Sequence, residues 1–178
     1  MLDRSLQALR GEELVEIDVV EEPRSFEVFF ASEHARLFGA LCLVTGDRSE
    51  AEEIMQDAFL RLWERWDRVA TMDDASAYLF RTAMNVFRNR YRRAALALRK
   101  TISVAPTEDA LATVEDRDVV VRALRDLTPD QRAAVVLTGY VGLTSEEAGK
   151  VLGMRAGTIR TLATRARAAI REKAGDPR

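Results

Sequence analysis

The strongest constraint on the fold is a spacing of three or four residues between apolar side chains, which recurs along most of the chain. Over residues 26–44 the positions with this spacing are Phe26, Phe29, Phe30, Leu37, Leu41 and Val44. Such spacing places apolar side chains on one face of an α-helix. Alternation of apolar and polar residues, which marks a half-buried strand, does not persist over a useful length. The pattern therefore predicts an all-α protein.

Turn and capping residues divide this pattern into separate helices. Gly46 ends the first helix, because glycine readily adopts the left-handed conformation that stops one. Ser49, with Glu52 three residues later, is expected to form a capping box for a second helix that ends near Val69. After a short polar loop, a third helix is expected over about 75–98.

The periodicity weakens in the middle of the chain and then returns. Residues 99–115 contain Pro106 and little pattern, so a linker is expected there. Farther on, Thr128 is suited to cap a helix and Pro129 to occupy its first position. The sequence thus predicts two small helical domains joined by a flexible linker. Their expected bounds are 1–23 for an acidic extension, 24–98 for the first domain, 99–115 for the linker and 116–174 for the second domain.

Charge is distributed unevenly although the formal net charge of the chain is only −2. Residues 1–67 carry 16 acidic side chains against seven arginines, and residues 81–100 carry seven basic side chains and no acid. A solvated helix usually mixes the two signs, since opposite charges four residues apart attract. A basic stripe beside an acidic body is typical of a nucleic-acid binder that has a second, protein-facing surface.

Composition excludes several classes of protein. A length of 178 residues, with 47% hydrophobic and 31% charged residues, suits a globular protein of one or two domains. No stretch approaches the roughly 18 uncharged apolar residues that a membrane helix needs, so no membrane insertion is expected. The acidic N-terminus is unlike a secretory signal. Cys42 is the single cysteine, so no internal disulfide can form and a cytoplasmic location is expected.

Residues 144–171 predict a helix-turn-helix. Thr144 and Glu147 form a second capping box, and a short helix runs to Leu152. Gly153 supplies the turn, and a longer helix starts near Ala156. The apolar stripe of this longer helix consists of Ile159, Ala163, Ala166 and Ile170. Its other side carries guanidinium and hydroxyl groups, as a DNA-recognition helix requires.

These features together resemble the extracytoplasmic-function (ECF, group IV) sigma factors of bacterial RNA polymerase, from about Phe26 to Lys173. The first signature is EAEEIMQDAFLRLWERW, Glu50–Trp66, which is similar to the acidic helix with which the family docks on the coiled coil of the polymerase β′ subunit. The resemblance assigns this contact to Glu53, Gln56, Asp57, Leu60 and Trp63.

The second signature is AYLFRTAMNVFRNRYRR, residues 77–93. It is similar to the family helix that captures and melts the promoter −10 element, with a preceding loop, here 70–76, that holds a flipped base. The resemblance places these residues near the −10 DNA: Tyr78, Arg81, Asn85, Arg88, Asn89, Arg92 and Arg93. An alternative for the rings of Phe80, Phe87 and Tyr91 is that they only pack in the domain core.

The third signature is the helix-turn-helix, which in the family reads the −35 element. The resemblance assigns that role to Arg155, Thr158, Arg160, Thr161, Thr164, Arg165 and Arg167. The sequence departs from the family at Ala148-Gly149, where Ile-Ala is usual, and at Thr161-Leu162-Ala163, where Ser-Arg-Leu is usual. Both departures bear on affinity and base preference at −35.

The resemblance also implies a set of partners. They are core RNA polymerase, through the β′ coiled coil and the β flap, promoter DNA, and an anti-sigma factor. Residues 99–115 are expected to thread the polymerase toward the RNA exit path.

An enzyme is not expected, because the sequence contains no P-loop, GxSxG, CxxC or HExxH motif. No catalytic residue, cofactor or metal site is predicted, since His34 is the only histidine and Cys42 lies in an apolar run.

Two other functions remain open from the sequence. One is a stand-alone helix-turn-helix regulator, which would need neither a docking helix nor a melting helix. The other is a sigma-like decoy that binds polymerase without initiating transcription.

Overall fold

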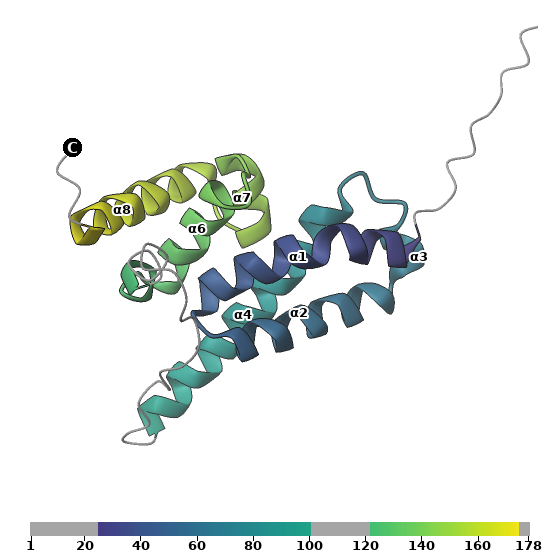
Figure 1. The fold of residues 1–178 in the computed structure, drawn as a ribbon, viewed down its shortest axis with the longest axis horizontal. Helices are drawn as coiled ribbons and strands as arrows, with labels where there is room; N and C mark the ends of the chain where they lie inside the picture. Colours follow the sequence, from purple (N-terminus) through teal and green to yellow (C-terminus); the bar gives the residue numbers. More distant parts are fainter. Residues whose placement is uncertain (1–24, 101–121, 175–178) are drawn as a thin grey trace, which may run out of the picture.

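A computed structural model describes residues 25–100 and 122–174, and within these ranges every regular element is a helix (Figure 1). The predicted all-α class is confirmed. The helices are α1 (Phe26–Thr45), α2 (Arg48–Trp63), α3 (Trp66–Val69), α4 (Ala75–Lys100), α6 (Pro129–Gly139), α7 (Ser145–Leu152) and α8 (Ala156–Ala174). The predicted extension 1–23, and the predicted linker from residue 101 onward, lie outside the described residues.

The second helix begins and ends differently from the sequence-based expectation. Asp47, not Ser49, is its N-cap, because the Asp47 side chain accepts a hydrogen bond from the amide of Glu50 at 2.7 Å. Glu52 instead forms an ion pair with Arg48. The helix also does not run to Val69, since Arg65 leaves the helical conformation and a separate short helix, α3, follows.

The first lobe is a bundle in which α1, α2 and α4 share one apolar core. The side chains that are fully or almost fully buried in it include Leu37, Leu41, Val44, Ile54, Leu62, Val69, Leu79, Phe80 and Met84. Phe80 and Phe87 are buried, which bears out core packing for these two rings, whereas Tyr91 is half exposed. Helix α1 has the length and mean hydropathy of a membrane span, but one of its faces forms part of this core.

The second lobe consists of α6, α7 and α8, and short-range signals in its sequence set its helix ends. Thr128 caps α6 and Thr144 caps α7, each in a capping box with the residue three positions later. Gly153 ends α7 with a φ of 65°, the left-handed conformation in which glycine is favoured. These predicted ends are confirmed.

The two lobes lie against each other (Figure 1), an arrangement that the sequence analysis did not foresee. Helix α6 packs on α1 and α7 packs on α4. The buried apolar residues of both lobes form one continuous cluster. The described part of the chain is therefore a closed pair of lobes.

Phe80→Ala is expected to lower the free energy of unfolding by about 3–5 kcal/mol, because it removes a fully buried ring and leaves a cavity. The measurement is urea unfolding followed by circular dichroism. Val28→Ala is the control: Val28 is 69% exposed, so the expected change is within about 0.5 kcal/mol. Similar losses from the two substitutions would contradict this account of the core.

Candidate polymerase and DNA interfaces

The polar face of α4 presents most of the residues predicted to lie near −10 DNA. Its apolar face, which includes Phe80, Met84 and Phe87, is buried against the first lobe. Helical geometry therefore turns the intervening residues outward. The predicted side chains that are exposed are Arg81, Asn85, Asn89, Arg92 and Arg93, whereas Tyr78 and Arg88 are half-buried. Five of the seven predicted residues thus lie on an accessible surface.

Arg90 interrupts the positive stripe, because the structure turns it toward α2. Its guanidinium donates to a carboxylate oxygen of Glu53 at 2.6 Å and to one of Asp57 at 3.1 Å. The hydrogen bond to Glu53 is the largest cause that raises the pKa of Arg90 above its usual value, and the hydrogen bond to Asp57 acts in the same direction. The sequence counts Arg90 as part of the stripe, but in space it joins the acidic helix to the basic one.

The predicted polymerase-docking residues lie along one exposed face of α2. Gln56, Leu60 and Trp63 are exposed, and Leu60 and Trp63 keep 58% and 55% of their surface open. The carboxylates of Glu53 and Asp57 remain partly open beside Arg90. Exposed apolar side chains next to carboxylates are typical of a protein-docking surface.

A cluster of aromatic rings from α1, α2 and α3 packs beneath this face. The Trp63 ring meets Phe26 edge-on, with ring centroids 4.9 Å apart. Phe26 also contacts Trp66, and Phe30 lies 4.7 Å from Phe59 between ring centroids. Packed rings of this kind fix the position of Trp63 at the surface.

The helix-turn-helix has the predicted division into a buried and an exposed face. Ile159, Ala163 and Ala166 of α8 are buried. The predicted −35 residues all lie on the exposed side, and they are Arg155, Thr158, Arg160, Thr161, Thr164, Arg165 and Arg167.

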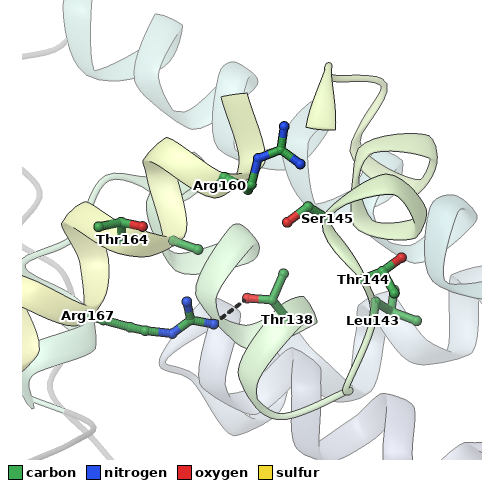
Figure 2. Close-up of a pocket in the computed structure, with 8 residues that line it drawn as sticks. Thr138, Leu143, Thr144, Ser145, Arg160, Thr164 and Arg167 are labelled. Atoms are coloured by element: carbon green, nitrogen blue, oxygen red, sulfur yellow. Dashed lines mark hydrogen bonds between the residues drawn. The ribbon is translucent and has the colours of Figure 1, made fainter. Parts of the chain in front are cut away.

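Three of these residues, with parts of α6 and α7, surround a hollow of about 340 Å³ (Figure 2). Arg160, Thr164 and Arg167 come from α8, and Thr138 and Ser145 face them from α6 and from the start of α7. Arg167 donates to the Thr138 hydroxyl at 3.0 Å, and Arg160 pairs with Glu146 at 3.2 Å. Both guanidiniums are thereby held at the rim of the hollow and stay exposed.

The two departures from the family pattern have a structural explanation. A Cβ atom at Gly149 would come within 2.7 Å of the backbone oxygen of Met154, so only glycine fits at this position without a shift of the turn. The Gly149 carbonyl also accepts the amides of Gly153 and Met154. In α8, Leu162 is half-buried against the core and Ala163 is buried, so these positions serve packing.

Sequence reasoning missed three charged residues at the contact between the lobes. Arg36 of α1 donates to the Val141 carbonyl at 2.7 Å, and Arg132 of α6 donates to the Val44 carbonyl at 2.9 Å. Asp130 pairs with Arg88 across the contact at 3.2 Å. Burial lowers the pKa of Arg132 from its usual value. A lone arginine that binds a distant backbone carbonyl leaves no pattern in the sequence.

The described residues were also compared with the requirements of a metal site and of a reactive thiol. They contain no group of three or more His, Cys, Asp or Glu side chains that could hold a metal ion. Burial is the main cause that raises the pKa of the Cys42 thiol, which makes it a poorer nucleophile at neutral pH.

An exposed apolar and acidic face on α2, a basic helix beside it and a basic helix-turn-helix are the features of a helical transcription protein. Comparison with family models agrees: residues 29–97 match Sigma-70 region 2, and residues 117–170 match Sigma-70, region 4.

Individual relatives cover most of the chain. The RNA polymerase sigma-E factor of Streptomyces avermitilis is 30% identical over 154 residues, which are 85% of this chain and 86% of that protein. The ECF RNA polymerase sigma factor SigM of Mycobacterium tuberculosis is 31% identical over 157 residues, or 88% of this chain and 80% of that one. The sigma factor RpoE from Bartonella quintana, solved with the anti-sigma factor NepR, is 25% identical with a TM-score of 0.73, over 86% of this chain and 98% of that one.

The chain belongs to the extracytoplasmic-function sigma factors of bacterial RNA polymerase. Its function is that of a sigma factor, which directs RNA polymerase to promoters, and the family is one of regulatory initiation factors.

Gly149→Ala is expected to destabilise the second lobe, although alanine is the better helix former by about 1 kcal/mol. Overpacking against the Met154 backbone oxygen costs about 1–3 kcal/mol, since backbone cannot move aside as a side chain can. Gly157→Ala is the matched control, because its Cβ would meet only the end of the Arg160 side chain at 3.9 Å. Urea unfolding should show a loss for the first variant and none for the second; equal behaviour would remove the steric role of Gly149.

Proposed function

We propose that this sigma factor divides its work among three helices. Helix α2 docks on the coiled coil of the polymerase β′ subunit, α4 with loop 70–76 captures and melts the −10 element, and α8 reads the −35 element while the second lobe meets the β flap. The observation that carries the proposal is the separation of exposed groups. Carboxylates and apolar side chains gather on α2, and guanidiniums gather on α4 and α8.

Docking on polymerase is proposed for the surface formed by Glu53, Gln56, Asp57, Leu60 and Trp63. Leu60 and Trp63 supply apolar area, and a tryptophan that is held by packed rings loses little freedom on binding. The two carboxylates make this face negatively charged, which suits a basic partner surface. Since the polymerase acts in the cytoplasm, the protein is proposed to act there.

Promoter opening is proposed for the exposed polar face of α4. Unpairing and extruding a base costs a few kcal/mol. Stacking of an aromatic ring on an unpaired base returns about 1–3 kcal/mol, and Tyr78 is the predicted ring that lies at the surface in part. The guanidiniums of Arg81, Arg92 and Arg93 hold phosphates and release counterions.

Recognition of the −35 element is proposed for the exposed side of α8. Residues near the start of a recognition helix reach base edges, which here means Arg155 and Thr158. An arginine can bind guanine through two hydrogen bonds, which discriminate against a wrong base by about 1–3 kcal/mol. Arg165 and Arg167, farther along α8, are proposed to contact phosphates.

An anti-sigma factor is the proposed negative regulator. The supporting observation is that the related RpoE from Bartonella quintana was solved in complex with the anti-sigma factor NepR. A pull-down from the native organism with this protein as bait tests for such a partner.

Run-off transcription with core RNA polymerase tests the docking assignment. Wild-type protein is expected to bind core and to initiate from promoter DNA. Glu53→Gln with Asp57→Asn should weaken core binding by about tenfold, or roughly 0.7 kcal/mol for each carboxylate, and leave the affinity for isolated duplex unchanged.

Arg90→Gln is the control for that pair, because it removes the partner of both carboxylates and leaves them in place. It should keep core binding. Equal loss of core and duplex binding would contradict the docking role. Duplex binding without core binding would indicate a stand-alone regulator, and core binding without initiation would indicate a decoy.

Arg165→Ala is expected to weaken binding to a promoter duplex and to make the dependence on salt shallower by about one unit in a plot of log K against log salt. The reason is that one phosphate contact fewer releases one counterion fewer. Fluorescence anisotropy at several salt concentrations measures the slope. Arg68→Ala, an equal charge change at an exposed site in the first lobe, is the control. An unchanged slope for Arg165→Ala would remove it from the phosphate contacts.

A further inference from the structure

We propose that Glu33 of α1 is a positioning residue for promoter opening, because its hydrogen bond with Ser76 holds the end of loop 70–76 and the start of α4 in place. The proposal rests on the proposed function in one respect, namely that this loop and the first turn of α4 receive a base extruded from the −10 element. Glu33 does not touch that base and acts only through the backbone that it holds.

The contact joins two helices through residues that lie 43 positions apart in the chain. The Ser76 hydroxyl donates to the Oε1 atom of Glu33 at 2.5 Å. Since α4 begins at Ala75, Ser76 belongs both to loop 70–76 and to the first turn of the helix. Glu33 lies in the middle of α1, a helix that is fixed by its buried residues on either side of this position. A side chain from a core helix is therefore bound to the point where the loop becomes α4.

The loop has two further hydrogen bonds that act locally. The amide of Met72 donates to the Val69 carbonyl at 3.0 Å, and the Met72 side chain is partly buried against the core. The Asp74 carboxylate accepts the amide of Ala77 at 2.7 Å, which is the pattern of a helix N-cap. Both bonds close over three residues of the chain, so neither ties the loop to α1 as the bond from Glu33 does.

The surroundings of Glu33 are unfavourable for a carboxylate that only fills space. Its side chain keeps 15% of its surface exposed, and its second carboxylate oxygen, Oε2, is buried without a hydrogen-bond partner. The Arg36 guanidinium pairs with this oxygen at 3.7 Å, which is too long for a hydrogen bond. Burial of a polar oxygen without a hydrogen bond costs free energy. The hydrogen bond from Ser76 is the contact that explains a carboxylate at this position.

A fixed start of α4 prepares the site before a base arrives. The first turn of a helix has free amides and frays readily. Tyr78, the ring that is proposed to stack on the extruded base, lies in this turn and is half-buried. A turn that is already ordered need not be ordered when the base binds, so less of the stacking energy is lost. If the untethered turn adopts the receiving conformation about one tenth of the time, the apparent equilibrium constant for opening falls about tenfold.

The test uses the full chain bound to core RNA polymerase, on a promoter duplex that carries 2-aminopurine in the −10 element. The fluorescence of this base rises when it leaves the stack, so it reports on opening separately from binding. Ser76→Ala removes the donor and Glu33→Met removes the acceptor, whereas Glu33→Gln keeps an amide oxygen that can accept from Ser76. Ser32→Ala is the matched control, because the Ser32 hydroxyl donates to the Phe29 carbonyl at 2.8 Å within α1.

Ser76→Ala and Glu33→Met are each expected to reduce opening about tenfold, while Glu33→Gln and Ser32→Ala stay within about twofold of wild type. All variants should bind core as the wild type does. The double variant Glu33→Met with Ser76→Ala should open no more slowly than either single variant, because all three lack the same hydrogen bond. Urea unfolding separates positioning from stability. The double variant replaces both partners by apolar groups, so it is expected to be at least as stable as wild type.

Wild-type opening in both single variants would overturn the positioning role of Glu33, whereas the proposed function of α4 would stand. Additive losses of opening in the double variant, or a loss of stability that accounts for the slower opening, would also overturn it. If the wild-type holoenzyme itself gives no rise in 2-aminopurine fluorescence, the proposed function of loop 70–76 and the positioning role are overturned together.

Discussion

Burial of one face of α4 is the constraint on which the rest of this structure depends. Phe80, Met84 and Phe87 fill the core between α1 and α2 with almost no exposed surface. Once these side chains are fixed, helical geometry decides where the arginines between them point. The same three residues place Arg90 over the carboxylates of α2 and leave Arg92 on the open surface. Hydrophobic packing of α4 thus decides which of its arginines pair with α2 and which remain exposed.

This sorting explains how an acidic docking face and a basic DNA face can occupy one small lobe. Arg90 binds both Glu53 and Asp57, so one positive charge meets two carboxylates at the boundary and the α2 side of it stays net negative. The carboxylates keep part of their surface open, and the apolar side chains of Leu60 and Trp63 extend the face away from α4. The α2 face is therefore negatively charged and the α4 face positively charged, and the two meet at Arg90. This arrangement favours recognition of two partners of opposite charge.

The sequence was informative wherever structure is set by neighbours along the chain. Thr128, Thr144 and Gly153 act within one helical turn, and their roles were predicted correctly. Ser49 shows the limit of such local rules, because Asp47 offers a competing cap two residues earlier and the strand-like conformation at Asp47 lets its carboxylate reach the free amide. The spacing of Arg88 along α4 assigns it to a charged face. Its partner, the Leu152 carbonyl, lies 64 positions away, and no pattern in the sequence predicts that contact.

The closed lobes affect the two proposed DNA surfaces unequally. Every residue proposed for −35 recognition on α8 is exposed in the closed arrangement, whereas Arg88 on α4 is covered by the second lobe. The proposed DNA surface on α8 is therefore free of contacts with the first lobe, whereas the proposed surface on α4 shares Arg88 with the second lobe. Because polymerase binding is proposed at α2, on a face that the second lobe leaves open, core can also engage the closed chain.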